Sequence, residues 1–199
     1  QHFSLASVPE LKDNVIAFFT ASKEHAMTGG RVGWVIGPKT IIDKDFDIQD
    51  ETYICPPSFS QFAALIALTG PQDHVGYFRR EFLKRRDVIS SRLDRLSEYF
   101  DYQRPQGAYY VFPRMQEPLV QDSSELKGRA AERWERIPER FRTSDTRLAL
   151  RLLYEAGVVS VPGISFGPQG GNHLRLSFAP EEANIHEAFD RIERWLKAA

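Results

Sequence analysis

The first part of the chain carries short apolar runs rather than a helical repeat. Two of them, Asn14–Phe19 and Val32–Gly37, have the length of buried strands and flank a polar loop with two glycines. A capping-box pattern at Ser58 and Gln61 precedes the segment FAALIALTG, which predicts a helix ending at Gly70. Because this helix is apolar on every side, we expect it to be buried.

From residue 71 to about residue 100 the pattern becomes one long amphipathic repeat. Apolar side chains recur there at spacings of three, four and seven, the periodicity of one helix face: Phe82, Ile89, Leu93, Leu96 and Phe100. A helix of this length suits a spine between two domains.

The remainder predicts a smaller α+β unit with strands at Ala108–Phe112, Val158–Pro162 and His173–Ala179. The third strand alternates cleanly, with one apolar face that contains Leu174, Leu176 and Phe178. The segment Met115–Arg142 is charged and poorly periodic, so we expect an excursion with one exposed helix.

Two further helices are expected in this unit. Thr143 or Ser144 caps the first, which Gly157 ends. Pro180 at the first helical position opens the last one, whose buried stripe contains Ile185, Phe189, Ile192 and Leu196. The fold class is therefore mixed α/β.

The amino-acid composition argues against several classes of function. The 199 residues are 42% hydrophobic and 27% charged with a net charge of −1, which is typical of a globular protein without a global attraction to nucleic acid or membranes. A single cysteine excludes an intrachain disulfide and favours a reducing, cytoplasmic location. No apolar run approaches the roughly 18 residues that span a bilayer. The five histidines lack metal-ligand spacing, so no metal site is expected.

The loop after the first strand contains the best candidate chemistry. Lys23 leaves an apolar strand beside the hydroxyls of Thr20 and Ser22, and a partly desolvated amine there could attack a carbonyl. Arg31 supplies the planar fork that suits a phosphate or carboxylate. On spacing alone, a solvated surface turn explains the same residues.

This loop resembles the lysine signature of class I/II aminotransferases, pyridoxal-phosphate enzymes of fold type I. The resemblance rests on Ser22-Lys23 followed by Met27–Trp34, with Gly30 where tryptophan is more usual. Further segments that resemble the family follow in the same order as in its members: Phe3–Pro9, Pro105–Phe112, Glu155–Gly167 and His173–Phe178. Only Met115–Arg142 has no counterpart.

The resemblance implies a role for each matching residue. Lys23 would form the Schiff base with pyridoxal phosphate and then move the substrate proton. Arg31 with Thr20, or with Ser22 as the second hydroxyl candidate, would bind the cofactor phosphate. Arg175 would bind the substrate α-carboxylate in a bidentate pair, from the strand face opposite Leu174 and Leu176. A solvated arginine is the alternative for that strand face.

A serine-hydrolase reading of the Gly163–Gly167 motif is disfavoured, because the required strand–turn–helix context is missing. The resemblance also implies a homodimer that acts on an amino acid and a 2-oxo acid. It leaves the substrate open, and also the choice between transaminase, lyase and racemase.

Several of the family's cofactor-binding motifs have no match here, including the aspartate that holds the pyridine nitrogen. The chain therefore resembles the C-terminal half of such an enzyme, and its start without Met fits a truncation. We expect residues 1–75 to be the end of the cofactor-binding large domain, 76–100 the inter-domain helix, and 101–199 the small domain, with 115–142 as a candidate insertion. One hypothesis is a transaminase of longer or two-piece form. The alternative is a catalytically incomplete fragment or interaction module, with an exposed sheet edge and an exposed apolar helix.

Overall fold

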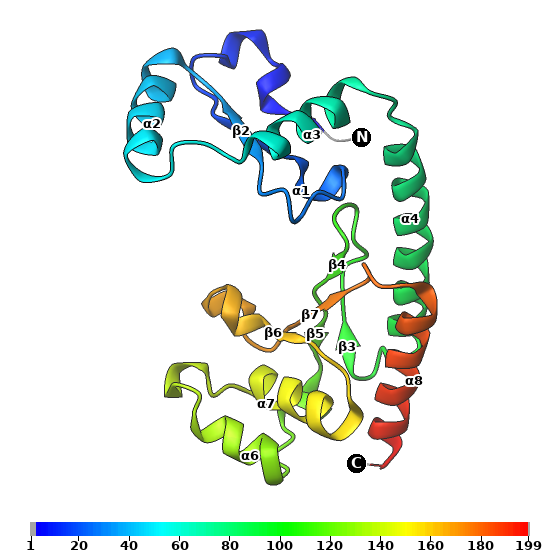
Figure 1. Ribbon diagram of the computed structural model, residues 1–199. Helices are drawn as coiled ribbons and strands as arrows, with labels where there is room; N and C mark the ends of the chain where they lie inside the picture. The colour runs from blue at the N-terminus through cyan, green and yellow to red at the C-terminus, as the bar shows by residue number, and fades with distance from the viewer. Residues whose placement is uncertain (1–2, 199) are drawn as a thin grey trace. The chain divides into compact units, whose positions relative to one another are not determined.

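The computed structural model describes residues 3–198 and contains two units. Unit 1 is Gln1–Phe78 and unit 2 is Arg79–Ala199, so the division falls within the long helix α4 (Asp73–Asp94) (Figure 1). Residues 1, 2 and 199, at the ends of the expected domains, lie outside the described residues. The expected long helix is present and ends at Asp94, ahead of a turn.

Unit 1 begins with the 3-10 turns Leu5–Ser7 and Pro9–Leu11, followed by an antiparallel hairpin. Strands β1 (Ala17–Thr20) and β2 (Gly33–Ile36) form it and confirm both predicted strands in shorter form. Their expected burial is wrong: no residue of either strand is buried and Phe18 is 77% exposed, because the described part of unit 1 has only a small core. Phe19 pairs with Trp34, and their rings stack with centroids 5.8 Å apart. A Cβ on Gly33 would lie 2.5 Å from the Phe19 carbonyl oxygen, so only glycine fits this close approach.

Helix α2 (Lys39–Thr52) follows β2 and was not predicted by the hydrophobic pattern. It begins after Pro38, and Lys39 forms an exposed ion pair with Asp43 at 2.7 Å. None of its residues is buried, and Phe46 is 66% exposed. Its apolar side chains are therefore not packed against a described core.

Helix α3 (Ser58–Thr69) corrects the expectation of a buried helix. Only Ser60 and Ala64 are buried, whereas Phe62 and Ile66 are 67% and 69% exposed. The physical reason is that the described part of unit 1 offers a core of only a few side chains for this helix to pack against: Ala21, Val32, Met27 and Trp34. The helix thus has the exposed apolar surface expected of half a domain.

The capping box of this helix was also predicted wrongly, although the end at Gly70 is confirmed. Pro57 occupies the N-cap position and Ser58 lies inside the helix without capping it. The Gln61 side chain donates to the Pro56 carbonyl oxygen at 2.8 Å instead of to an N-cap residue.

Unit 2 contains the main hydrophobic core, built on a three-stranded antiparallel sheet in the order β4-β7-β6. The strands are β4 (Tyr110–Val111), β6 (Val161–Pro162) and β7 (Leu174–Ser177). A second pair joins β3 (Phe100–Asp101) to β5 (Arg114–Met115). The predicted alternation of the third strand is confirmed by the buried side chains of Leu174, Leu176 and Phe178.

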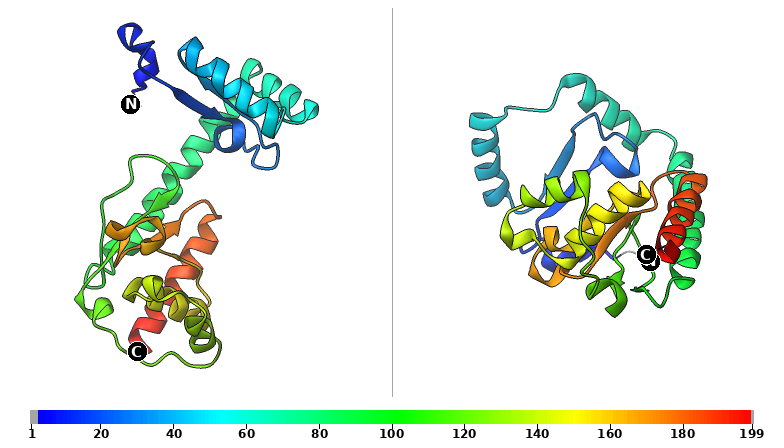
Figure 2. Two further views of the ribbon diagram at one scale, coloured as in Figure 1. Left: turned by 90° about the vertical axis from the view of Figure 1, so that its left-hand side faces the viewer. Right: turned by 90° about the horizontal axis from the view of Figure 1, so that it is seen from below.

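Helix α8 (Glu182–Ala198) lies beside the C-terminal part of α4, as Figures 1 and 2 show. Arg92 of α4 binds Glu193 at 2.9 Å and also Asp190, which fixes the two helices side by side. The predicted buried stripe is confirmed at Ile185, Phe189 and Ile192, while Leu196 is partly buried. The predicted start is wrong, because the helix begins two residues after Pro180.

Helix α7 (Ser144–Arg151) continues into a π-helical turn, Leu152–Ala156, which ends at Gly157 as predicted. Gly157 has φ +67°, the left-handed conformation that glycine adopts at helix ends. Thr143 occupies the N-cap position, but its hydroxyl hydrogen-bonds Thr146 Oγ1 at 3.1 Å rather than a backbone N–H.

The charged excursion is more structured than its sequence predicted. It contains α5 (Glu117–Val120), α6 (Gly128–Glu135) and the 3-10 turn Glu139–Phe141. It forms its own small cluster, with buried residues Leu126, Ala130 and Leu150 beside Ala131, Trp134 and Ile137. The prediction of a single exposed helix is therefore wrong, because a few apolar residues suffice to pack α6 onto α7.

Candidate active site

The lysine loop starts where β1 passes into the short helix α1 (Ala21–Glu24). Thr20 caps this helix, since its Oγ1 accepts a hydrogen bond from the Ser22 backbone N–H at 3.1 Å. The same Thr20 hydroxyl lies 2.9 Å from Ser22 Oγ, to which it donates. The two hydroxyls therefore form one pair directly before Lys23.

An apolar anchor holds the backbone of this loop. Ala21 is fully buried and packs with Val32 and Ala64, and its N–H donates to the Val32 carbonyl oxygen at 3.3 Å. Met27 returns to the anchor by donating its N–H to the Ala21 carbonyl oxygen at 3.4 Å. The loop is thus closed at both ends, while the side chains of Lys23 and Arg31 are exposed.

Lys23 is exposed, and no hydrogen bond or ion pair of its amine occurs among the described residues 3–198. Two positions later, His25 Nδ1 lies 3.0 Å from His74 Nε2, which ties the loop to the first turn of α4. The two histidines are 49 residues apart in the sequence, so no local pattern indicates their contact.

Arg31 ends the loop with φ +49°, a left-handed conformation that is rare for a residue with a Cβ. Its Nη1 donates to the Thr28 carbonyl oxygen at 3.0 Å, and its side chain is exposed. The strained backbone therefore places a guanidinium on the same loop as Lys23, with donors to spare for a ligand.

Arg175 lies in unit 2 on β7, where its neighbours Leu174 and Leu176 are buried on the opposite face. Its guanidinium carbon is 4.4 Å from the ring centroid of Tyr110 and 4.9 Å from that of Phe166. No carboxylate pairs with it among residues 3–198. The rings that flank this cation were missed by sequence reasoning, because they come from β4 and from a turn after β6.

The Gly163–Gly167 motif is not a nucleophile elbow in this fold. After β6 the chain forms two 3-10 turns, Gly163–Phe166 and Pro168–Gly170, and then enters β7. The elbow needs a strand followed by a helix. A serine nucleophile is therefore not supported here.

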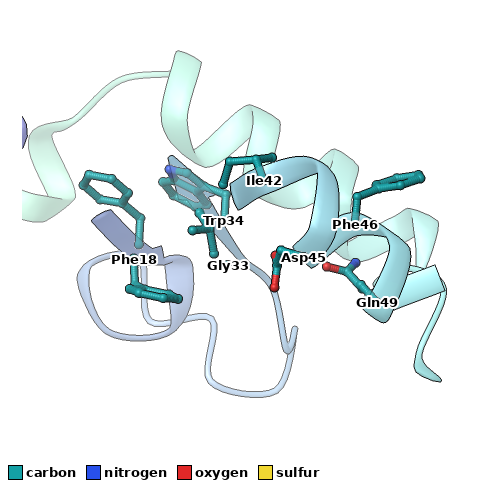
Figure 3. A pocket seen from close by; sticks show the side chains of 9 residues that line it. Phe18, Gly33, Trp34, Ile42, Asp45, Phe46 and Gln49 are labelled. Carbon is teal, nitrogen blue, oxygen red and sulfur yellow. The ribbon is translucent and has the colours of Figure 1, made fainter. Parts of the chain in front are cut away.

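A pocket of unit 1 lies apart from the lysine loop, between the hairpin and α2. Figure 3 shows Phe18 and Trp34 on one side of it, and Ile42, Asp45 and Gln49 on the other. None of the predicted site residues lines it, so we assign it to the uncovered apolar surface rather than to the site.

Two further kinds of feature are absent from residues 3–198. No group of three or more metal-binding side chains occurs there. No helix within that range combines the length and the apolar character that a membrane span requires.

The anchored loop presents a lysine that can react with a carbonyl, and β7 presents an arginine that can bind a carboxylate. Both residues lie in segments whose order along the sequence resembles class I/II aminotransferases. A family model for aminotransferase class I and II matches residues 3–192. The chain belongs to this family, and the structures similar to it are fold-type I aminotransferases. The predicted fold class is thereby confirmed.

Individual relatives carry aminotransferase names. An aspartate aminotransferase of Geobacillus stearothermophilus is 34% identical over all of this chain and 45% of its own length. An aromatic-amino-acid aminotransferase of Thermococcus litoralis is 30% identical over 99% of this chain and 45% of its own length. The chain thus spans less than half of these relatives.

Solved structures give the same result. An aromatic aminotransferase from Pyrococcus horikoshii has a TM-score of 0.81 at 30% identity, covering 100% of this chain and 47% of its own. An aspartate aminotransferase mutant from Thermus thermophilus has a TM-score of 0.79 at 31% identity, covering 98% of this chain and 46% of its own.

Proposed function

We propose that this chain contributes the catalytic lysine and the substrate-binding arginine to pyridoxal-phosphate-dependent transamination between an amino acid and a 2-oxo acid, within a longer or two-piece enzyme. The observation that carries the proposal is the exposed Lys23 amine, without a partner among residues 3–198, on an anchored loop directly after a pair of hydroxyls. Family membership supports it, because aminotransferases of this class generally use this cofactor.

The residues of the loop fit the cofactor. The Thr20–Ser22 hydroxyl pair and the Arg31 guanidinium are the donor types that bind a phosphate. Pyridoxal phosphate, when bound, supplies an aldehyde that condenses with amines and a ring that withdraws electrons. We infer that Thr20, Ser22 and Arg31 would hold the phosphate and that the Lys23 amine would condense with the aldehyde, with release of water.

Lys23 then serves as the base and acid of the reaction. As a free amine, Lys23 Nζ would take the proton from the substrate α-carbon and deliver it to the carbon that was the cofactor's aldehyde carbon. Its exposed side chain has no ion-pair partner among residues 3–198, so no carboxylate has to be displaced before the amine acts.

Arg175 binds the substrate carboxylate in this proposal. The Tyr110 and Phe166 rings flank its guanidinium, and cation–π contact with both rings holds the cation. A carboxylate can then accept two parallel N–H bonds from the guanidinium edge. This orientation fixes the substrate α-carbon with respect to the arginine.

The uncovered face of unit 1 supports a longer or two-piece enzyme. Phe59, Phe62 and Ile66 of α3 are 67–74% exposed at helical spacing, so they form a patch rather than scattered surface apolar residues. We propose that the portion matching the remainder of the relatives covers this face, and that the assembly is a cytoplasmic homodimer. The same face supports the alternative, an interaction module without activity of its own.

Activity measurements with matched lysine variants test the proposal. The chain is assayed alone and together with the N-terminal portion of a full-length relative, for conversion of an amino acid and pyridoxal phosphate to the 2-oxo acid. In the complete assembly, we expect Lys23→Ala to abolish conversion and Lys39→Ala, at an exposed surface pair, to leave it unchanged. Conversion that survives Lys23→Ala contradicts the proposal. Conversion absent from every complete assembly favours the interaction module.

A further inference from the structure

Asp145 is a fully buried carboxylate in the first turn of α7 that the proposed reaction does not use. Its Oδ2 accepts a hydrogen bond from the Ile164 backbone N–H at 2.9 Å. Its Oδ1 has no hydrogen-bond partner among residues 3–198. Burying a carboxylate with only one hydrogen-bonded oxygen costs free energy, so the bond from Asp145 to the Gly163–Phe166 turn is not explained by stability alone.

We propose that Asp145 is a positioning residue, which holds the Gly163–Phe166 turn so that Phe166 covers the guanidinium of Arg175. The inference rests on the proposed function for the role of Arg175 as the carboxylate-binding group. It adds a residue that touches neither substrate nor cofactor and acts through the turn.

The start of the turn is fixed to the sheet by backbone contacts. Gly163 donates its N–H to the His173 carbonyl oxygen at 2.8 Å, and a Cβ on Gly163 would overlap the Gly170 carbonyl oxygen. The next residue, Ile164, directs its N–H to Asp145 instead of to the sheet. The carboxylate is therefore the side-chain anchor of the turn just before it projects Phe166.

Phe166 depends on this anchor because its own packing is sparse. Its side chain is 53% exposed, and its described ring contacts are the edge of Phe112, with centroids 5.9 Å apart, and the Arg175 cation. A half-exposed ring gains too little from burial to hold a surface turn in one place. Release of the turn would thus uncover one side of the guanidinium.

Chemical labelling of arginine tests this coupling in the chain as it exists. Phenylglyoxal reacts with accessible guanidinium groups, and peptide mass gives a separate rate for each arginine. We expect Asp145→Ala to raise the Arg175 rate by about tenfold, for loss of a hydrogen bond to a charged group. Phe166→Ala should raise it to a similar extent, because it removes the covering ring itself. The double variant is expected to show no further increase, because both changes remove the same ring.

Asp145→Asn is the matched variant, since its amide oxygen can still accept from the Ile164 N–H. We expect it to keep the slow Arg175 rate. Arg92, which is 7% exposed and ion-paired within the same unit, reports global unfolding. If Asp145→Ala also raises the labelling rate of Arg92, the variant has unfolded and Asp145→Asn decides. In Asp145→Asn, slow labelling of both Arg175 and Arg92 supports the proposal. Fast labelling of Arg175 with slow labelling of Arg92 overturns it.

Two other results overturn the proposal directly. One is an unchanged Arg175 rate in Asp145→Ala when Phe166→Ala raises it. The other is an effect of the double variant equal to the product of the two single effects. These rates require no cofactor, so they are read independently of whether Lys23 supports transamination. In an active assembly, Asp145→Ala should raise KM for the amino acid while kcat at saturation stays near the original value.

Discussion

The two units differ in how completely each buries its own apolar surface. Unit 2 encloses Leu93, Val111, Leu152, Leu174 and Phe178 at 0–1% exposure, within one continuous core. Unit 1 buries Ala21, Val32 and Ala64 but leaves whole faces of α2 and α3 exposed. A sequence segment can therefore form helices and strands while burying few of its own apolar side chains. Unit 2 contains a hydrophobic core of its own, whereas the described part of unit 1 contains only a small cluster.

The largest expected difference between the units comes from two phenylalanines. Phe178→Ala in unit 2 removes a side chain that is 1% exposed and should lower the free energy of unfolding by about 3–5 kcal/mol. Phe62→Ala in unit 1 removes one that is 67% exposed and should change it by no more than about 0.5 kcal/mol. Urea unfolding of both variants measures this. Equal losses would contradict the contrast between the units.

A smaller effect is expected on association. Phe62→Glu introduces a charge into the exposed face of α3, so it should lower self-association of the chain several-fold. Val159→Glu is the matched control, because Val159 is 77% exposed and belongs to unit 2 rather than to α3. Sedimentation velocity measures the change. If Val159→Glu lowers self-association as much as Phe62→Glu, the exposed face of α3 is not the surface through which the copies associate.

The smallest effect concerns the acid stability of unit 2. Partial burial by itself raises the pKa of Asp122, but hydrogen bonds from Ser124 and the charge of Arg151 outweigh it and lower the pKa below its usual range. A pKa lowered by folding contributes stability above the unfolded-state pKa of about 4, and this is lost as the pH falls through the folded-state pKa.

Asp122→Asn should therefore remove about 1 kcal/mol of stability at neutral pH and flatten the loss below pH 4. Urea midpoints at neutral and acidic pH measure the difference. Asp43→Asn in unit 1 is the matched control, since its ion pair with Lys39 is exposed on both sides. If Asp122→Asn and the unsubstituted chain lose the same stability below pH 4, the acid-dependent stability does not come from Asp122.

Sequence reasoning succeeded where the determinants are local. Period-two alternation predicted the burial of Leu174, Leu176 and Phe178, and Gly157 marked a helix end because its φ is positive. The residue order around Lys23 indicated the family, which the match over residues 3–192 confirms. Each of these signals lies within a few residues of the feature that it predicts.

Sequence reasoning failed where tertiary contacts decide. An apolar repeat cannot show whether anything covers α3, so Phe62 was expected to be buried and is exposed. The rings beside Arg175 come from residues 110 and 166, and the pairing of His25 with His74 is equally non-local. Within 115–142, the packing of Ala130 depends on Leu150 of another helix, and no local period reports it.

The most direct test of the central claim is the site of covalent attachment of pyridoxal phosphate. The cofactor is added to the complete assembly, the product is reduced with borohydride, and the modified peptides are identified by mass. We predict one dominant adduct on Lys23, which decreases when an amino acid is added before reduction, while Lys39 stays at background. Equal labelling of several lysines, unaffected by the amino acid, would contradict the assignment of Lys23 as the catalytic residue.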